Sequence, residues 1–176
     1  KHTKSAGPFV QREIDLTIMP NALCKNGIDS SNNFACKSAS PTTYVAAVVR
    51  VATQWSLMDS GVKFLLGTEL GYAPIKPKES AIGGSSSGDA DGLAYQLTFN
   101  FIDFFPKHNI GLVYGRAGGG WLISPDFSSN NTLKEIRYAW KFSKKQKLEF
   151  RLRQRDNIVG ADRSRKDLYL RYTIKY

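Results

Sequence analysis

The last nine residues of the chain, 168–176, read LYLRYTIKY and alternate strictly between two kinds of side chain. In a β-strand, successive side chains point to opposite faces. One row therefore runs from Leu168 to Tyr176 and is apolar or aromatic, and the other row includes Arg171 and Lys175. The alternation predicts a strand with one apolar and one polar face.

Seven further segments show the same period of two, and none shows a convincing helical period. The segment 110–122 is the least regular of them. The chain is therefore predicted to be all-β and antiparallel, with eight strands in one domain spanning 1–176. The seven segments are 9–19, 44–57, 62–72, 93–103, 110–122, 133–142 and 147–155.

The connections between these strands alternate between long and short. The short ones are 58–61, 103–109 and 143–146. Transmembrane barrels of the outer membrane have short periplasmic turns and long external loops, whereas a soluble sandwich has no reason to sort its loops. We therefore expect both chain ends at the short-turn side and all the long loops at the other. The long loops are 20–43, 73–92, 118–132 and 156–166.

The apolar rows end in aromatic residues, which resembles the two aromatic girdles of a membrane barrel. Ordinary core aromatics of a soluble β-domain are the alternative. Trp55, Phe101, Trp140 and Tyr176 lie near the short-turn end, and Tyr72 and Trp121 lie near the other. The row predicted to face lipid includes Leu97, Phe99, Tyr138, Trp140, Phe150, Leu152, Leu170 and Tyr172.

The composition is compatible with a transmembrane β-barrel. The 176 residues are 41% hydrophobic and 23% charged, with a formal net charge of +10. The mean hydropathy of −0.33 is low, and the sequence has no run of about 18 apolar residues, which excludes a transmembrane helix but not transmembrane strands. The basic excess is compatible with an ordinary solvated surface, or with nucleic acid, anionic lipid or an anion pathway as the partner.

The block NFIDFFPKHNIGLVYGRAGGGWLISPDFSSNNTLKEIRYAWKFSKKQKLEFRLRQR, residues 100–155, resembles the C-terminal part of bacterial porins of the phosphate-selective porin O and P type. In that family a stretch similar to ISPDF…N..L.EIRY.W.FSK…LE.R.R.R precedes a last strand that ends on an aromatic residue. The resemblance covers most of 90–176 and implies a barrel in the outer membrane of a Gram-negative bacterium. It also implies passage of small anionic, phosphate-like solutes, with no cofactor and no enzymatic activity.

Members of that family are larger and have more strands. The resemblance therefore implies that this chain is the C-terminal half of a larger barrel, lacking an N-terminal barrel half, or acts as a homo-oligomer. Outer-membrane lipid, lipopolysaccharide and small anions are the expected partners, and nucleic acid is not. No anion-binding motif of the family can be matched to residues of this sequence.

The polar rows concentrate basic residues. Pairing Phe142 with Leu148, and Gln154 with Leu168, places Arg137 opposite Arg153 and Arg151 opposite Arg171, while Glu135 faces Arg155, Lys141 faces Glu149 and Arg155 lies by Asp167. The predicted lumen-facing basic cluster is Arg137, Arg151, Arg153 and Arg171, and Gln96 and Asn100 face inward with it. Further predicted lumen charges are Arg50, Lys63, Lys147, Arg155 and Lys175.

Burying unpaired arginines inside a filled eight-stranded barrel costs several kcal/mol, whereas a wide, water-filled lumen tolerates them and attracts anions. The cluster therefore favours a wide pore. A small barrel whose interior is plugged by salt bridges to Glu13, Asp15, Glu69 and Glu135 is the alternative.

Cys24 and Cys36 lie in the first long loop, in a segment rich in Asn, Ser and Lys. We expect a disulfide, and hence an oxidising compartment, because a metal site needs more ligands than this segment offers. Residues 88–92, GDADG, match part of a calcium loop but lack the distal glutamate. His108 is expected to be solvated in its turn.

Three functions compete on this reading. The first is an outer-membrane porin or a large part of one. The second is a small eight-stranded barrel with a structural or adhesive role, and the third is a soluble basic β-domain that binds nucleic acid on aromatic platforms. An enzyme ranks last, because we find no serine near either histidine on an adjacent strand.

Overall fold

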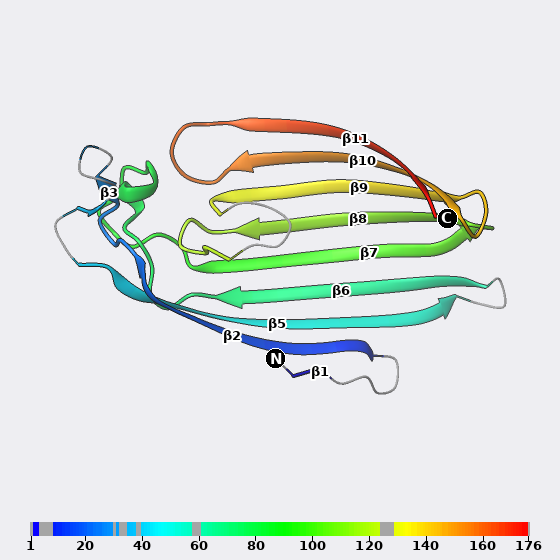
Figure 1. The fold of residues 1–176 in the computed structure, drawn as a ribbon, viewed down its shortest axis with the longest axis horizontal. Helices are drawn as coiled ribbons and strands as arrows, with labels where there is room; N and C mark the ends of the chain where they lie inside the picture. The colour runs from blue at the N-terminus through cyan, green and yellow to red at the C-terminus, as the bar shows by residue number, and fades with distance from the viewer. Residues whose placement is uncertain are drawn as a thin grey trace.

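The computed structural model consists of one large antiparallel sheet and a small two-stranded hairpin, and it describes residues 2–3, 9–29, 31, 35–37, 40–57, 61–123 and 129–175 (Figure 1). The strand order of the large sheet is β1-β2-β5-β6-β7-β8-β9-β10-β11. All eight strands predicted from the alternation are present, so the all-β antiparallel prediction is confirmed. The bounds are β1 (His2–Thr3), β2 (Phe9–Leu23), β5 (Thr42–Leu57), β6 (Val62–Tyr72), β7 (Leu93–Phe105), β8 (His108–Ala117), β9 (Asn131–Lys141), β10 (Gln146–Asn157) and β11 (Ser164–Ile174).

The long connections gather at one end of the sheet, as the loop lengths predicted (Figure 1). They hold the small hairpin β3 (Ile28–Asp29) and β4 (Ala35–Cys36) and the 3₁₀ turn η2 (Glu79–Ile82). Backbone hydrogen bonds join the loops in sequence. Lys78 N donates to Lys25 O at 2.7 Å, Gly120 N to Asp91 O at 2.8 Å and Ile158 N to Asn130 O at 3.1 Å.

The prediction for the two chain ends is right for one of them. Strand β11 ends at the short-turn end (Figure 1). Strand β1, however, folds back along β2 with His2 opposite Ile14. The start of the described chain therefore lies beside the middle of β2. Strand β2 pairs with β5 on one side only, so the backbone groups on its other side are available to pair with β1.

Two hairpins have a register that differs by two residues from the predicted one. Leu148 pairs with Trp140 rather than Phe142, and Gln154 pairs with Lys166 rather than Leu168. Both turns are tighter than expected, because Ser143 N donates to Gln146 O and Asn157 N to Arg163 O. A shift of two keeps every side chain on its predicted face but changes its neighbours.

The sheet has one face lined by apolar side chains, called here the apolar face. Phe99, Leu112, Ile136, Leu152 and Leu168 are successive cross-strand neighbours along it. Side chains on this face are exposed, Leu152 by 45% and Leu168 by 69%. The register places every residue of the predicted lipid-facing row on this face, and Gln96, Asn100, Arg137, Arg151, Arg153 and Arg171 on the other.

The opposite face, called here the polar face, carries the buried residues. Near the loop end it holds a core that includes Tyr44, Val113, Ala117 and Leu133. The chain after β8 turns back across this core, where Trp121 is 2% exposed. Trp121 was predicted to lie in the loop-end girdle, and this is wrong, because Gly71 on the polar face leaves room for its indole ring.

The sheet remains open over the described residues. Strand β11 pairs with β10, and β2 pairs with β1 and β5, but no ladder joins β11 to β1 or β2 in these ranges. The sheet therefore has two edges, and the predicted closure into a barrel is not found within this part of the chain.

Candidate functional site on the polar face

The first charged group on the polar face surrounds Arg50 of β5. Its guanidinium donates to Glu69 at 2.8 Å and to Glu13 at 3.3 Å, and also to Asp15. Arg50 is one of the residues predicted from the sequence to face the lumen. The structure places it on the polar face but surrounds it with three carboxylates, so this part of the face is not basic.

The second charged group lies on β9 and β10 and converges on Glu135. This side chain is fully buried, and it accepts a hydrogen bond from Arg153 Nε at 2.5 Å. Arg151 Nε lies 3.6 Å from the same carboxylate, and Arg137 also donates to it. The predicted match of Glu135 with Arg155 is therefore wrong, because the two-residue register shift puts Arg153 opposite Glu135.

Strand β11 completes this second group. Arg155 forms its expected ion pair with Asp167. Arg171, predicted to face Arg151, instead lies opposite Glu149, and Tyr169 takes the position opposite Arg151. Arg171 Nε donates to the Tyr169 hydroxyl at 2.6 Å, and its guanidinium lies 5.1 Å from the ring centre.

A cavity of about 420 Å³ opens between these side chains. Arginine dominates its lining, and guanidinium groups are strong donors to anions. The arginines remain within reach of water, since Arg151 has a 34% exposed side chain. The lining residues are Arg151, Arg153, Arg165, Asp167, Leu168, Tyr169 and Arg171.

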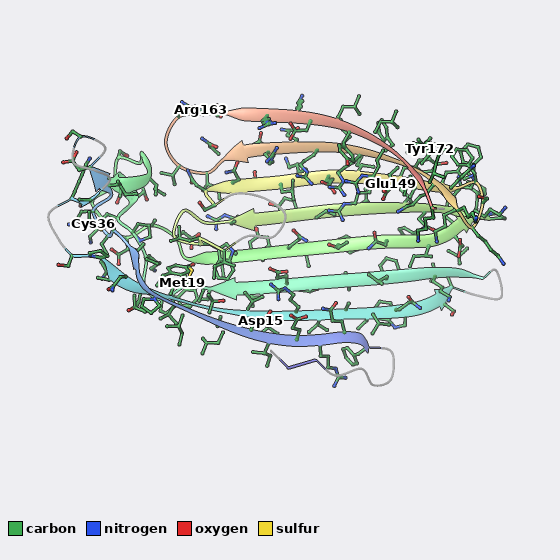
Figure 2. All side chains as sticks on the ribbon, viewed as in Figure 1. Asp15, Met19, Cys36, Glu149, Arg163 and Tyr172 are labelled. Atoms are coloured by element: carbon green, nitrogen blue, oxygen red, sulfur yellow. A yellow bond between two sulfur atoms is a disulfide. The ribbon has the colours of Figure 1, made fainter. Side chains whose placement is uncertain are left out.

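A second cavity, of about 270 Å³, extends the basic strip toward the short turns. Lys147 donates to Glu149 at 2.7 Å and Lys175 lines the same cavity, while Lys63 lies on β6, away from this strip. Figure 2 labels Asp15 and Glu149, which belong to the separate charged groups on β2 and β10. Charge is thus segregated along the polar face, with the basic excess on β9–β11. The second cavity is lined by Lys141, Ser143, Lys144, Lys145, Gln146, Lys147, Thr173 and Lys175.

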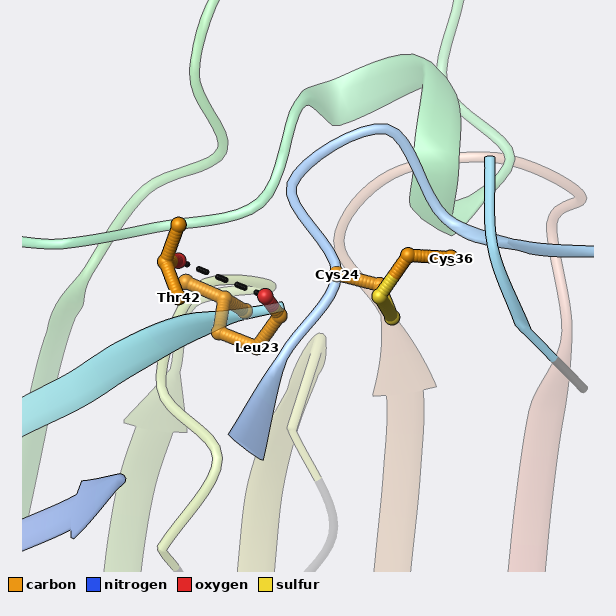
Figure 3. The surroundings of a disulfide bond; sticks show 4 residues. All are labelled: Leu23, Cys24, Cys36 and Thr42. Atoms are coloured by element: carbon orange, nitrogen blue, oxygen red, sulfur yellow. Dashed lines mark hydrogen bonds between the residues drawn. A yellow bond between two sulfur atoms is a disulfide. The ribbon is translucent and has the colours of Figure 1, made fainter. Parts of the chain in front are cut away.

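The predicted disulfide is present in the first long loop (Figure 3). The Cα atoms of Cys24 and Cys36 are 5.0 Å apart, within the range that a disulfide requires. Beside it, the Thr42 hydroxyl donates to Leu23 O at 3.3 Å. This closes the base of the loop next to the start of β5.

The calcium-loop fragment in the second loop is engaged by basic residues. Lys78 Nζ lies 3.0 Å from Asp89, and Asp91 pairs with Arg116. The hydrogen bond from Lys78 holds the pKa of Asp89 below its ordinary value. Both carboxylates are therefore engaged in ion pairs that hold the second long loop in place.

His108 was expected to be solvated in its turn, but it contacts two aromatic side chains. Its Nδ1 lies 2.5 Å from the Tyr138 hydroxyl, and its ring stacks on Trp140 with centres 5.3 Å apart. Trp55 stacks on Phe64 at 5.7 Å farther along the same end of the apolar face. The predicted aromatic row at the short-turn end is therefore present, whereas Tyr176 lies outside the described residues.

A scan of protein-family models, a search of known proteins and a search of solved structures each found no match to this chain. Among the described residues, no helix is long and apolar enough to span a bilayer. The geometry thus defines only a structural class: an antiparallel sheet with an exposed apolar face and a polar face that carries buried carboxylates and a half-exposed basic strip.

Proposed function

We propose that this sheet is part of the wall of an outer-membrane porin through which small anionic, phosphate-like solutes diffuse. The apolar face is directed to lipid and the polar face to the lumen. The observation that carries the proposal is the inverted distribution of side chains, with apolar rows exposed and carboxylates such as Glu13 and Glu135 buried.

Exposed apolar area of this extent is unusual for a soluble monomer, which rarely shows a contiguous patch larger than a few hundred Å². Here the exposed rows continue across all eight long strands, from Leu16 on β2 to Leu170 on β11. The strands are 10 to 16 residues long, and about 9–11 tilted residues suffice to cross a bilayer. The aromatic row at the short-turn end supports an interface at that level.

The strip on β9–β11 supports anions as the solutes. Its arginines and lysines outnumber its carboxylates, and Arg137, Arg151 and Arg153 all lie against the carboxylate of Glu135. In a confined, water-filled lumen, such an excess raises the local concentration of anions.

The two open edges support a barrel wider than eight strands. Leu168 and Leu170 on the edge strand β11 are 69% and 67% exposed, whereas Leu152 on the inner strand β10 is 45% exposed. Exposed edges are not viable in a bilayer, because their backbone groups would find no partner. Further strands, from another part of a longer chain or from a second copy, would close the wall.

The test is ion selectivity of the chain reconstituted in planar bilayers under a salt gradient. Replacing Arg151→Gln and Arg153→Gln should shift the reversal potential toward cations, and the shift should shrink with salt because the Debye length is about 10 Å at 0.1 M. Lys134→Gln with Lys166→Gln is the matched control, since it removes the same charge from the apolar face of the neighbouring strands.

An unchanged reversal potential in the arginine variant would show that these residues do not set selectivity. Insertion without conductance would favour the small barrel with a structural or adhesive role. A chain that stays in the aqueous phase and binds oligonucleotides would favour the soluble nucleic-acid-binding alternative.

A further inference from the structure

The apolar face has a basic row at its loop end, on strands β9–β11. Lys134 on β9 lies opposite Gln154 on β10, and Gln154 lies opposite Lys166 on β11. The next row toward the short turns is fully apolar and consists of Ile136, Leu152 and Leu168 in the same register. The row formed by Lys134, Gln154 and Lys166 therefore marks the border of the apolar band on the side of the long loops.

A cavity of about 260 Å³ lies at this border. Ile136 and Leu152 form its apolar part, and each is 45% exposed. Lys134, Gln154 and Lys166 supply polar donors at its rim. The cavity thus combines an apolar surface that a hydrocarbon chain can contact with two ammonium groups. The full lining is Lys134, Glu135, Ile136, Leu152, Arg153, Gln154 and Lys166.

The carboxylates near the cavity are already engaged. Asp156, the next residue on this face of β10, accepts hydrogen bonds from Ser164 Oγ at 2.6 Å and from Gln154 Nε2 at 3.1 Å. Glu135 is held by the arginines of the polar face. Lys134 and Lys166 form no ion pair within 4 Å of a carboxylate in the described ranges, although Asp156 interacts electrostatically with both lysines at longer range.

The position of the row along the strands fits the headgroup layer of a membrane rather than the interior of the bilayer. Tyr114 on β8 lies directly opposite Lys134, and its ring is 6.1 Å from that of Tyr95. Tyrosine and lysine are typical of the membrane–water interface, where lysine stems lie along apolar surface and place their charge in the headgroup layer. The row lies at the end that bears the long loops, which face outward in outer-membrane barrels.

We propose that Lys134 and Lys166 bind a phosphate group of lipopolysaccharide, the phosphorylated glycolipid of the outer leaflet, while Ile136 and Leu152 contact one of its acyl chains. This inference rests on the proposed membrane location. Because the two lysines are two strand spacings apart, about 10 Å between backbones, their long side chains can converge on one phosphate above Gln154.

The test measures glycolipid retained by the full chain after reconstitution in vesicles and extraction in mild detergent. The probes are rough lipopolysaccharide with its lipid phosphates, the same glycolipid after enzymatic dephosphorylation, and phosphatidylglycerol. Lys134→Gln with Lys166→Gln is compared with Lys144→Gln and Lys145→Gln, which remove the same charge from the short turn at the other end.

We expect the first variant to lose about thirtyfold in affinity for the phosphorylated glycolipid, since each lysine near a membrane surface contributes about 1 kcal/mol toward anionic lipid. The turn variant and wild type should bind alike, and the dephosphorylated glycolipid should bind poorly to both. Equal binding of phosphorylated and dephosphorylated glycolipid, or of phosphatidylglycerol and lipopolysaccharide, would overturn the assignment.

Membrane insertion is scored separately by flotation of the vesicles and by heat-modifiable gel migration. Insertion without glycolipid retention overturns this inference and leaves the porin proposal standing. A chain that does not insert overturns both the porin proposal and the glycolipid site, because the site can bind glycolipid only within a membrane.

Discussion

Glu135→Gln is the substitution that tests the charged site most directly. The glutamine keeps the size of the side chain but removes the negative charge that Arg137, Arg151 and Arg153 share. Removing one partner of a buried ion pair costs about 3–5 kcal/mol. The arginines have side chains that are 33%, 34% and 16% exposed, so water offsets part of this cost and we expect a loss of about 2–3 kcal/mol.

The assay is urea unfolding of the chain in detergent micelles, followed by tryptophan fluorescence. Glu149→Gln is the matched control, since Glu149 has a 29% exposed side chain and pairs with Lys147. It should lose no more than about 1 kcal/mol. Glu135→Gln should also increase anion selectivity in bilayers, because the wall gains a positive charge.

Equal stability of the two glutamine variants would refute the reasoning. It would mean that the three arginines are solvated independently and that Glu135 does not hold them. A loss of stability without any change in selectivity would separate the structural role of Glu135 from conduction.

Gly71→Ala should displace the loop that follows β8 and cost about 1–3 kcal/mol in urea unfolding, because the added methyl would overlap the indole of Trp121. Gly67→Ala is its control, since its methyl would lie at an ordinary 3.6 Å from the nearest side-chain atom; equal effects would exclude the loop contact as the cause. Cys24→Ser with Cys36→Ser should lower stability by about 3 kcal/mol in the chain-entropy model, and limited proteolysis should then cut the first loop while the strands persist. Unchanged proteolysis would mean that contacts with the neighbouring long loops hold the first loop in place without the disulfide.

The alternation of side chains predicted the strands and their faces correctly. Period two is local, so each strand can be read from its own residues without its neighbours. The order of loop lengths predicted which connections share an end, because antiparallel strands joined in sequence bring every second connection to the same side.

The register and the partners of the charged residues were not predictable in the same way. A hairpin shifted by two residues keeps its faces, so the apolar pattern does not distinguish the two registers. Hydrogen bonds of the turn, such as Ser143 N to Gln146 O, decide between them. This shift makes Glu135 the shared partner of Arg137, Arg151 and Arg153 instead of the partner of Arg155.

Contacts between distant segments also depended on the tertiary structure. Trp121 has the residue type of an interfacial aromatic, but it packs over Gly71, from a strand that lies 50 positions earlier in the chain. Local pattern therefore determined the strands, their faces and the basic composition of the polar rows. The register of the hairpins, the fold of the loops over the polar face and the open edges of the sheet depend on hydrogen bonds and packing between segments, and no local period encodes these.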